Sequence, residues 1–220
     1  MTNSAQARAD ALRAAQQPTG WWGRLKAALG LTAPVSAEAA AEIRNWDAGA
    51  EGERRTVELL RVLGVEGWYG LYDRAVPETD RANLDFFLVA PSGRVFTVDA
   101  KLWGRNGVVR AHRGRLLHGD RHYERVMPAI RLETKRVEAA LRKELAPTGR
   151  TCPVVTPVIA MHNASVADDG FTLDGVRVVP ADRLLNLLRT QAGPADPQWA
   201  ATVAAAADEV LPRYVEDGER

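Results

Sequence analysis

Hydrophobic and polar positions alternate along the chain in two patterns that predict a mixture of helices and strands. Apolar residues at helical spacing predict helices over 48–63 and 128–145, and an Ala-rich helix is expected over 197–211. Short apolar runs bounded by turn residues predict strands, which are expected over 68–72, 84–90, 94–101, 154–161 and 175–179. This order of elements predicts an α/β protein with a mixed central sheet flanked by helices.

Two of these strands are expected to form a hairpin with opposed acidic residues. The turn Pro91-Ser92-Gly93 suits a three-residue loop with a left-handed glycine, so Ala90 should pair with Arg94. Counting outward in this register places Asp85 opposite Asp99. Like charges that face each other across a sheet are destabilising, so this pair indicates a functional requirement.

Lys101 lies on the same face as Asp99, because side chains two residues apart on a strand point the same way. Two facing carboxylates can share a divalent cation, and hard oxygen ligands suit Mg²⁺ (or Mn²⁺). Only four of the 29 basic residues are lysines, and a lysine can change its protonation state where an arginine cannot. The alternative interpretation is a surface cluster of acids neutralised by a lysine.

The predicted helix over 48–63 contributes a further acidic candidate. Glu53 lies four residues before Val57 on the stripe that continues through Leu60 and Leu63, so it should point inward. Gly52 in the same helix is unfavourable unless the backbone approaches another element closely. The alternative is that Glu53 only interacts favourably with the positive end of the helix dipole.

Positive charge is concentrated directly after Lys101. Residues 101–150 contain 13 Lys and Arg and five Asp and Glu, a local net charge of +8, although the whole chain has +1. A basic hairpin over 108–118 and one face of the helix over 128–145 carry much of this charge. We expect a surface that binds nucleic-acid phosphates, or alternatively a solvated cationic face. The expected contact residues are Arg105, Arg110, Arg131 and Lys135.

The motifs 49–53 (GAEGE), 83–86 (NLDF) and 98–104 (VDAKLWG), followed by a basic hairpin and a Pro-initiated helix, resemble the nuclease-related domain (NERD) family of the PD-(D/E)XK nuclease superfamily. The resemblance covers about residues 46–190 and implies a restriction-endonuclease-like αβββαβ core. It also implies that Asp85 and Asp99 bind the metal, that Lys101 is the catalytic lysine and that Glu53 is the helix acid.

Two departures from the family pattern are visible. The family usually has Glu where this chain has Asp99, which shortens the side chain by one methylene. It also commonly has Asn-Pro followed three residues later by Gln, where this chain has Met127-Pro128 followed by Arg131.

The two ends of the chain differ from this central region. Residues 1–45 are expected to form an Ala-rich helix and linker, with Trp21 and Trp22 as a weak membrane or protein contact. Residues 191–220 are expected to form a C-terminal helix and polar tail. Cys152 is the only cysteine, and no apolar run is long enough for a membrane helix, so a cytoplasmic protein is expected; the oligomeric state stays open.

Two functions are compatible with these features. The first is divalent-metal-dependent hydrolysis of phosphodiester bonds in nucleic acid, with DNA as the expected substrate. The alternative is a catalytically weak or inactive nucleic-acid-binding module on the same fold. Zinc binding by His118 and His122 is disfavoured, because Gly119 and Asp120 between them predict a turn.

Overall fold

The structure is a computed structural model that describes residues 37–79 and 82–214, with side chains from residue 48 onward. The chain divides into two compact units between Glu51 and Gly52, inside the first described helix, and the sheets, the later helices and the sites described below belong to the second unit. Trp21 and Trp22 lie outside the described residues. Among the described residues, no helix is long and apolar enough to cross a membrane.

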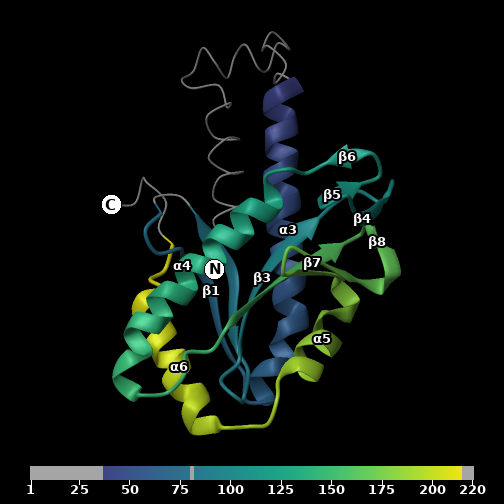
Figure 1. The fold of residues 1–220 in the computed structure, drawn as a ribbon. Coiled ribbons are helices and arrows are strands. Elements are labelled where there is room, and N and C mark those ends of the chain that lie inside the picture. The colour runs from purple at the N-terminus through teal and green to yellow at the C-terminus, as the bar shows by residue number, and fades with distance from the viewer. Residues whose placement is uncertain (1–36, 80–81, 215–220) are drawn as a thin grey trace, which may run out of the picture. The chain divides into compact units, whose positions relative to one another are not determined.

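The predicted helices and longer strands are all present (Figure 1). The helices are α3 (Ala37–Val65), α4 (Val126–Leu145), α5 (Leu184–Gln191) and α6 (Pro197–Val210). The longer strands are β1 (Tyr69–Ala75), β2 (Asn83–Val89), β3 (Val95–Leu102), β4 (Val108–His112), β5 (Arg115–His118), β7 (Val155–His162) and β10 (Val176–Pro180). Three shorter strands are β6 (Arg121–His122), β8 (Ser165–Val166) and β9 (Phe171–Leu173).

The main sheet has six strands in the order β1-β2-β3-β7-β10-β9. Strands β1, β2 and β3 are antiparallel neighbours, whereas β3, β7 and β10 run parallel. Helix α4 lies in the connection between β3 and β7, as a parallel crossover requires. The predicted fold class, a mixed central sheet flanked by helices, is confirmed.

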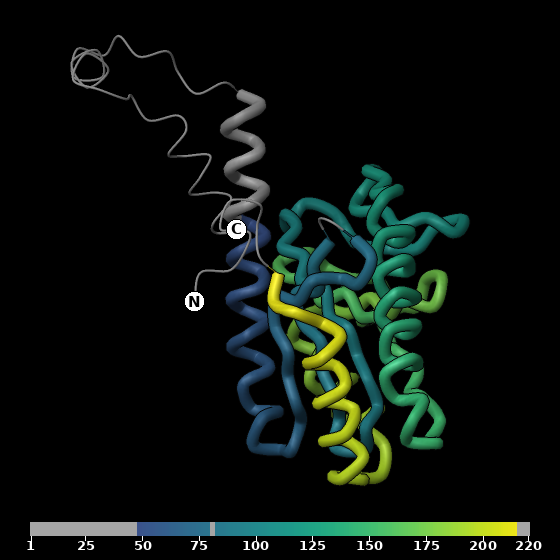
Figure 2. Tube along the Cα trace, turned by 90° about the vertical axis from the view of Figure 1, so that its left-hand side faces the viewer, coloured from purple at the N-terminus to yellow at the C-terminus, as the bar shows by residue number. Residues whose placement is uncertain are grey.

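Helices cover both faces of this sheet (Figure 2). On one face, α4 and α6 pack against alternate residues of β2 and β3, such as Phe87 and Val95. On the other face, α3 and α5 pack against the intervening residues, such as Phe86 and Val98. Successive strand residues therefore point into two different hydrophobic layers, which follows from the period of two along a strand.

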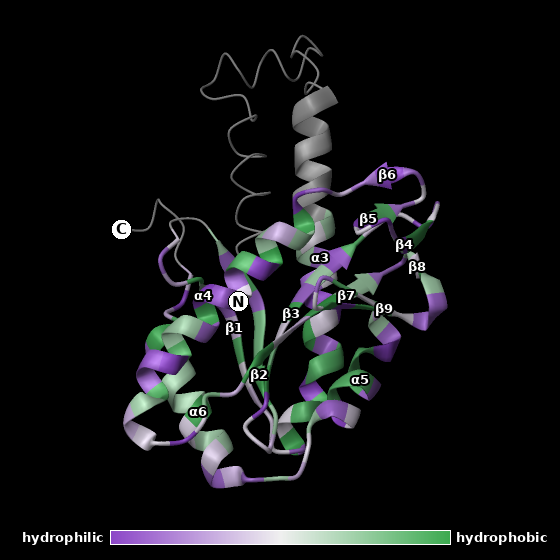
Figure 3. Cartoon of the chain, in the orientation of Figure 1, coloured by the Kyte–Doolittle hydropathy of each residue, from purple (hydrophilic) through white to green (hydrophobic). Residues whose placement is uncertain are grey.

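A second sheet, with strand order β6-β5-β4-β8, follows β3. The predicted basic hairpin forms β4 and β5 with the expected boundaries, and β6 is hydrophilic (Figure 3). His118 and His122 belong to neighbouring strands joined by a turn at Gly119, which agrees with the predicted turn. Strands β6, β8 and β9 were not predicted, because two or three residues are too few to display a period.

The start of α3 differs from the prediction. The helix was expected to begin at residue 48, but its backbone is helical from Ala37. The additional residues are mainly Ala and Glu, which have high helix propensity, so they extend the helix without the apolar stripe used to predict it.

Candidate active site

The β2–β3 hairpin has the register that its turn predicted. Gly93 has a left-handed backbone with φ of 83°, and the N–H of Ala90 donates to the carbonyl of Arg94 at 2.8 Å. The last paired residues of the ladder are Phe86 and Val98. One step further along the same register places Asp85 opposite Asp99.

The hairpin brings both carboxylates and Lys101 together. The backbone N–H of Ala100 donates to Oδ2 of Asp85 at 2.9 Å. Lys101 Nζ lies 2.7 Å from Oδ1 of Asp99, and these two side chains are 31% and 25% exposed. The other oxygen of Asp99, Oδ2, is buried and has no hydrogen-bond partner among the described residues.

Burial and mutual repulsion change the protonation of this cluster. Burial, followed by the negative charge of Asp99, raises the pKa of Asp85 to about 7, although Lys101 and the hydrogen bond from Ala100 oppose this rise. Burial alone would lower the pKa of Lys101, but the charges of Asp99 and Asp85 outweigh it and raise that pKa. The lysine is therefore an ammonium ion at neutral pH.

Glu53 approaches this cluster from α3, which covers the opposite face of the sheet from the one to which Asp85 and Asp99 point. A Cβ atom added to Gly52 would lie 3.3 Å from Cβ of Leu102, so the predicted close approach of the helix at this glycine is observed. Burial, then the charges of Asp85 and Asp73, raises the pKa of Glu53 to about 8. Glu53 is thus electrostatically part of the cluster.

Glu133 on α4 is an acidic member of the site that the sequence analysis missed. Burial and the charge of Asp99 raise its pKa to about 7. A cavity of about 10 Å³, close to the room that one water molecule needs, is bordered by Asp85, Asp99 and Glu133. The missed signal was spacing: Glu133 lies three residues after Ile130 and four before Val137, on the buried stripe of its helix.

The four expected nucleic-acid contacts lie on three separate segments, namely the loop after β3, strand β4 and helix α4. Arg105 is exposed in the loop after β3, and Arg110 on β4 donates to the carbonyl of Gly119 at 3.0 Å. Arg131 and Lys135 are exposed on α4, two residues to either side of Glu133. Arg131 also lies 3.5 Å from Asp174, so part of its charge is compensated within the protein.

The Asp85–Asp99 pair has the chemistry of a small cation site. Oδ2 of Asp99 lacks a donor, and an oxygen of this kind can bind a metal. A cation beside Asp85 would also favour its ionised form over the protonated form that burial favours. Within residues 37–79 and 82–214, no group of three or more His, Cys, Asp or Glu residues is arranged to hold a metal ion.

A mixed sheet between helices, with carboxylates and a lysine at the end of a central hairpin, defines an α/β protein with a nuclease-like fold. Residues 48–162 match the family described as the nuclease-related domain, NERD. The chain therefore belongs to the nuclease-related domain family. Its matched segment contains Glu53, Asp85, Asp99, Lys101 and Glu133. The chain has no significant match among curated proteins or among solved structures.

Proposed function

We propose that the protein is a divalent-metal-dependent phosphodiesterase that cleaves nucleic acid, with DNA as its first expected substrate. The observation that carries this proposal is the contact geometry of Asp85, Asp99 and Lys101 at the end of one hairpin. Membership of the nuclease-related domain family supports the same reaction class.

Asp85 and Asp99 would hold Mg²⁺ (or Mn²⁺) between β2 and β3. When bound, the cation supplies positive charge at the scissile phosphate and lowers the pKa of water. The unpartnered Oδ2 of Asp99 and the second oxygen of the Asp85 carboxylate, whose Oδ2 accepts from Ala100, are the atoms available for this contact.

Lys101 acts in this proposal as a hydrogen-bond donor. The charges of Asp99 and Asp85 raise its pKa in the metal-free protein, so the side chain is an ammonium ion there at neutral pH. Its ammonium group can orient the attacking water or donate to a phosphate oxygen, where it stabilises the negative charge of the transition state. A neutral side chain at position 101 would not supply this positive charge to the transition state.

Glu53 and Glu133 are the proton acceptors in this proposal. A general base works best when its pKa is near the working pH, and the pKa values of about 8 and about 7 satisfy this condition. Glu53 supports the attacking water from the α3 side, and Glu133 faces the small cavity from α4. Arg105, Arg110, Arg131 and Lys135 would hold the phosphates that flank the cleaved bond.

One observation favours the alternative, a non-enzymatic nucleic-acid-binding module. Lys101 lies against Asp99 in an ion pair of 2.7 Å and thereby compensates the carboxylate without a metal. If that pair persists in solution, the cluster is a stabilising network and the basic surface alone provides the function.

A cleavage panel separates the two functions. Wild-type protein is incubated with single-stranded DNA, double-stranded DNA and RNA, with Mg²⁺, with Mn²⁺ or with EDTA. Lys101→Ala is measured in parallel for cleavage and for DNA binding. We expect metal-dependent cleavage by the wild type and a loss of at least about 100-fold in Lys101→Ala, because general acid–base and electrostatic groups each contribute about that factor.

The DNA affinity of Lys101→Ala should stay within about threefold of the wild type, since one phosphate-directed charge among several is removed. No cleavage of any substrate by the wild type, together with unchanged binding, would support the binding module. Equal cleavage by wild type and Lys101→Ala would contradict the role given to the lysine.

A further inference from the structure

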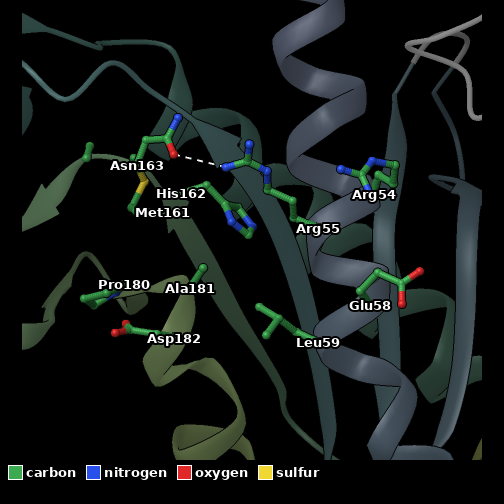
Figure 4. Close-up of a pocket in the computed structure, with 11 residues that line it drawn as sticks. Arg54, Arg55, Glu58, Leu59, Met161, His162, Asn163, Pro180, Ala181 and Asp182 are labelled. Atoms are coloured by element: carbon green, nitrogen blue, oxygen red, sulfur yellow. Dashed lines mark hydrogen bonds between the residues drawn. The ribbon is translucent and has the colours of Figure 1, made fainter.

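A second cavity, of about 620 Å³, lies beside α3 (Figure 4). It is bordered by four residues of α3 (Arg54, Arg55, Glu58 and Leu59) and by residues 161–164 and 180–182. Residues 161–164 include the end of strand β7 and the two residues after it, and residues 180–182 include the end of the parallel strand β10 and the two residues after it. In open α/β sheets, ligands bind beyond the carboxyl ends of the strands.

His162, which lines the cavity, is held in place by a buried polar contact with Thr56. Thr56 is fully buried, His162 is almost fully buried, and Oγ1 of Thr56 lies 2.7 Å from Nε2 of His162. Thr56 also donates to the carbonyl of Gly52 at 3.0 Å. Because a hydroxyl has one proton, His162 must then donate from Nε2, so the contact fixes the tautomer and the orientation of the ring.

The cavity has chemically different ends. At one end, Nη1 of Arg55 donates to Oδ1 of Asn163 at 3.1 Å, which holds the guanidinium over the cavity. Figure 4 shows Asp182 at the other end, across the cavity from the side chain of Leu59, with the His162 ring and Ala181 between the two ends. An anion is favoured at the arginine end and a hydrogen-bond donor at the aspartate end, while the middle is largely apolar.

We propose that this cavity binds a nucleoside monophosphate unit. Arginine matches phosphate oxygens with its forked donors, the apolar wall contacts the face of the base, and Asp182 accepts from a sugar hydroxyl or a base amino group. The volume lies within the roughly 300–1,000 Å³ of small-molecule sites. Arg55, the apolar wall and Asp182 all border this one cavity, and all belong to the same compact unit, residues 52–220.

The same helix links this cavity to the candidate active site. Glu53 is electrostatically coupled to Asp85 and Asp99, and Arg55, two residues later, borders the cavity. For a nuclease, the terminal nucleotide of a bound strand would be a second ligand of this cavity beside the free mononucleotide. That extension rests on the proposed nuclease function, whereas binding of a free mononucleotide does not.

Isothermal titration calorimetry of the full chain tests the proposal. The experiment uses the Lys101→Ala variant in EDTA, so that neither cleavage nor a metal contributes. The ligands are 2′-deoxyadenosine 5′-monophosphate (dAMP), 2′-deoxyadenosine and inorganic phosphate. We expect saturable binding of dAMP at least about tenfold tighter than of either part, because each part makes only some of the contacts.

Three variants on the same background locate the ligand. Arg55→Ala should weaken dAMP binding about tenfold and leave deoxyadenosine binding unchanged, since it removes a charge-assisted contact to phosphate. Leu59→Trp narrows the cavity and should weaken both ligands. Arg142→Ala is the matched control, because it removes an exposed arginine of α4 outside the cavity, and it should change neither affinity.

Circular dichroism verifies the fold of each variant. Asp182→Ala, at an exposed position, provides an independent measurement if Arg55→Ala is misfolded.

Displacement of dAMP by a single-stranded oligonucleotide with a terminal phosphate identifies the strand end as the ligand. No displacement identifies the free nucleotide as the ligand. Absence of saturable dAMP binding overturns the proposal, as does dAMP binding that is unaffected by Arg55→Ala, Leu59→Trp and Asp182→Ala. Because cleavage is not measured, these results are independent of whether the protein is a nuclease.

Discussion

Replacement of Asp85 by Asn should stabilise the metal-free protein at neutral and alkaline pH. The asparagine keeps an oxygen that can accept the hydrogen bond from Ala100. It removes the negative charge that burial and Asp99 make unfavourable. A candidate metal ligand is thus predicted to reduce the stability of the protein that carries it, as is common for functional sites.

The pKa of Asp85 gives the magnitude. It is raised from 3.8 to about 7, a difference of about three units. At 1.36 kcal/mol per pKa unit, the ionised Asp85 carboxylate would destabilise the folded state by about 4 kcal/mol. Asp85 is partly exposed, so we halve this value for solvent screening and expect a gain of roughly 2 kcal/mol.

The direction of the pH dependence follows from proton linkage. An acid whose pKa is higher in the folded state destabilises that state only where the unfolded chain ionises it. The penalty is therefore absent below about pH 4, grows as the pH rises towards about 7 and is constant above that value. The stabilisation by Asp85→Asn should grow over the same interval.

Urea unfolding in EDTA, followed by the fluorescence of the buried Trp68 and Trp199, measures this difference. The gain should be roughly 2 kcal/mol at pH 8 and roughly 0.8 kcal/mol at pH 5, where the unfolded chain already ionises most of this acid. Asp120→Asn is the control, because Asp120 is fully exposed and its loss should change stability little at either pH. A variant that is no more stable than the wild type at pH 8, or equally stabilised at both values, would refute the reasoning.

Two further predictions concern the turn of the hairpin and the basic face of α4. Gly93→Ala should destabilise the protein by about 3 kcal/mol or more, because the glycine has positive φ and an added Cβ would collide with the ring of Trp199. Gly114 also has positive φ but faces open space, so Gly114→Ala should lower the free energy of unfolding by only about 1–2 kcal/mol. The same urea titrations measure both variants. Arg131→Ala and Lys135→Ala should each lower the slope of log Kd for DNA against log salt by about 0.9. Fluorescence anisotropy between about 50 and 200 mM salt measures this slope. An unchanged slope would exclude a phosphate contact by the substituted residue.

Local sequence signals predicted most of the elements that carry the site. The turn 91–93 specified the register of the hairpin because a left-handed glycine and a three-residue loop allow few alternatives. Apolar spacing located α4 within two residues at its start and at the same final residue. Gly52 indicated a close backbone approach, which the neighbouring Leu102 provides.

Other features needed the packed structure. Glu133 lies on the buried stripe of α4, but its spacing alone could not show which strands that stripe would meet. The direction from which Glu53 approaches depended on the face of the sheet that α3 covers, which helix phase does not specify. The Arg55 cavity joins residues from three distant segments, and no local pattern connects them.

The sequence by itself determined the order of the elements, the opposition of Asp85 and Asp99 and the alignment of Lys101 beside them. These features depend on strand period and turn geometry, which act over a few residues. The tertiary structure alone decided which charges surround this cluster, and therefore which carboxyl groups have raised pKa values. Burial and Coulomb interactions act through space between α3, α4 and the hairpin, so they exist only once the layers have packed.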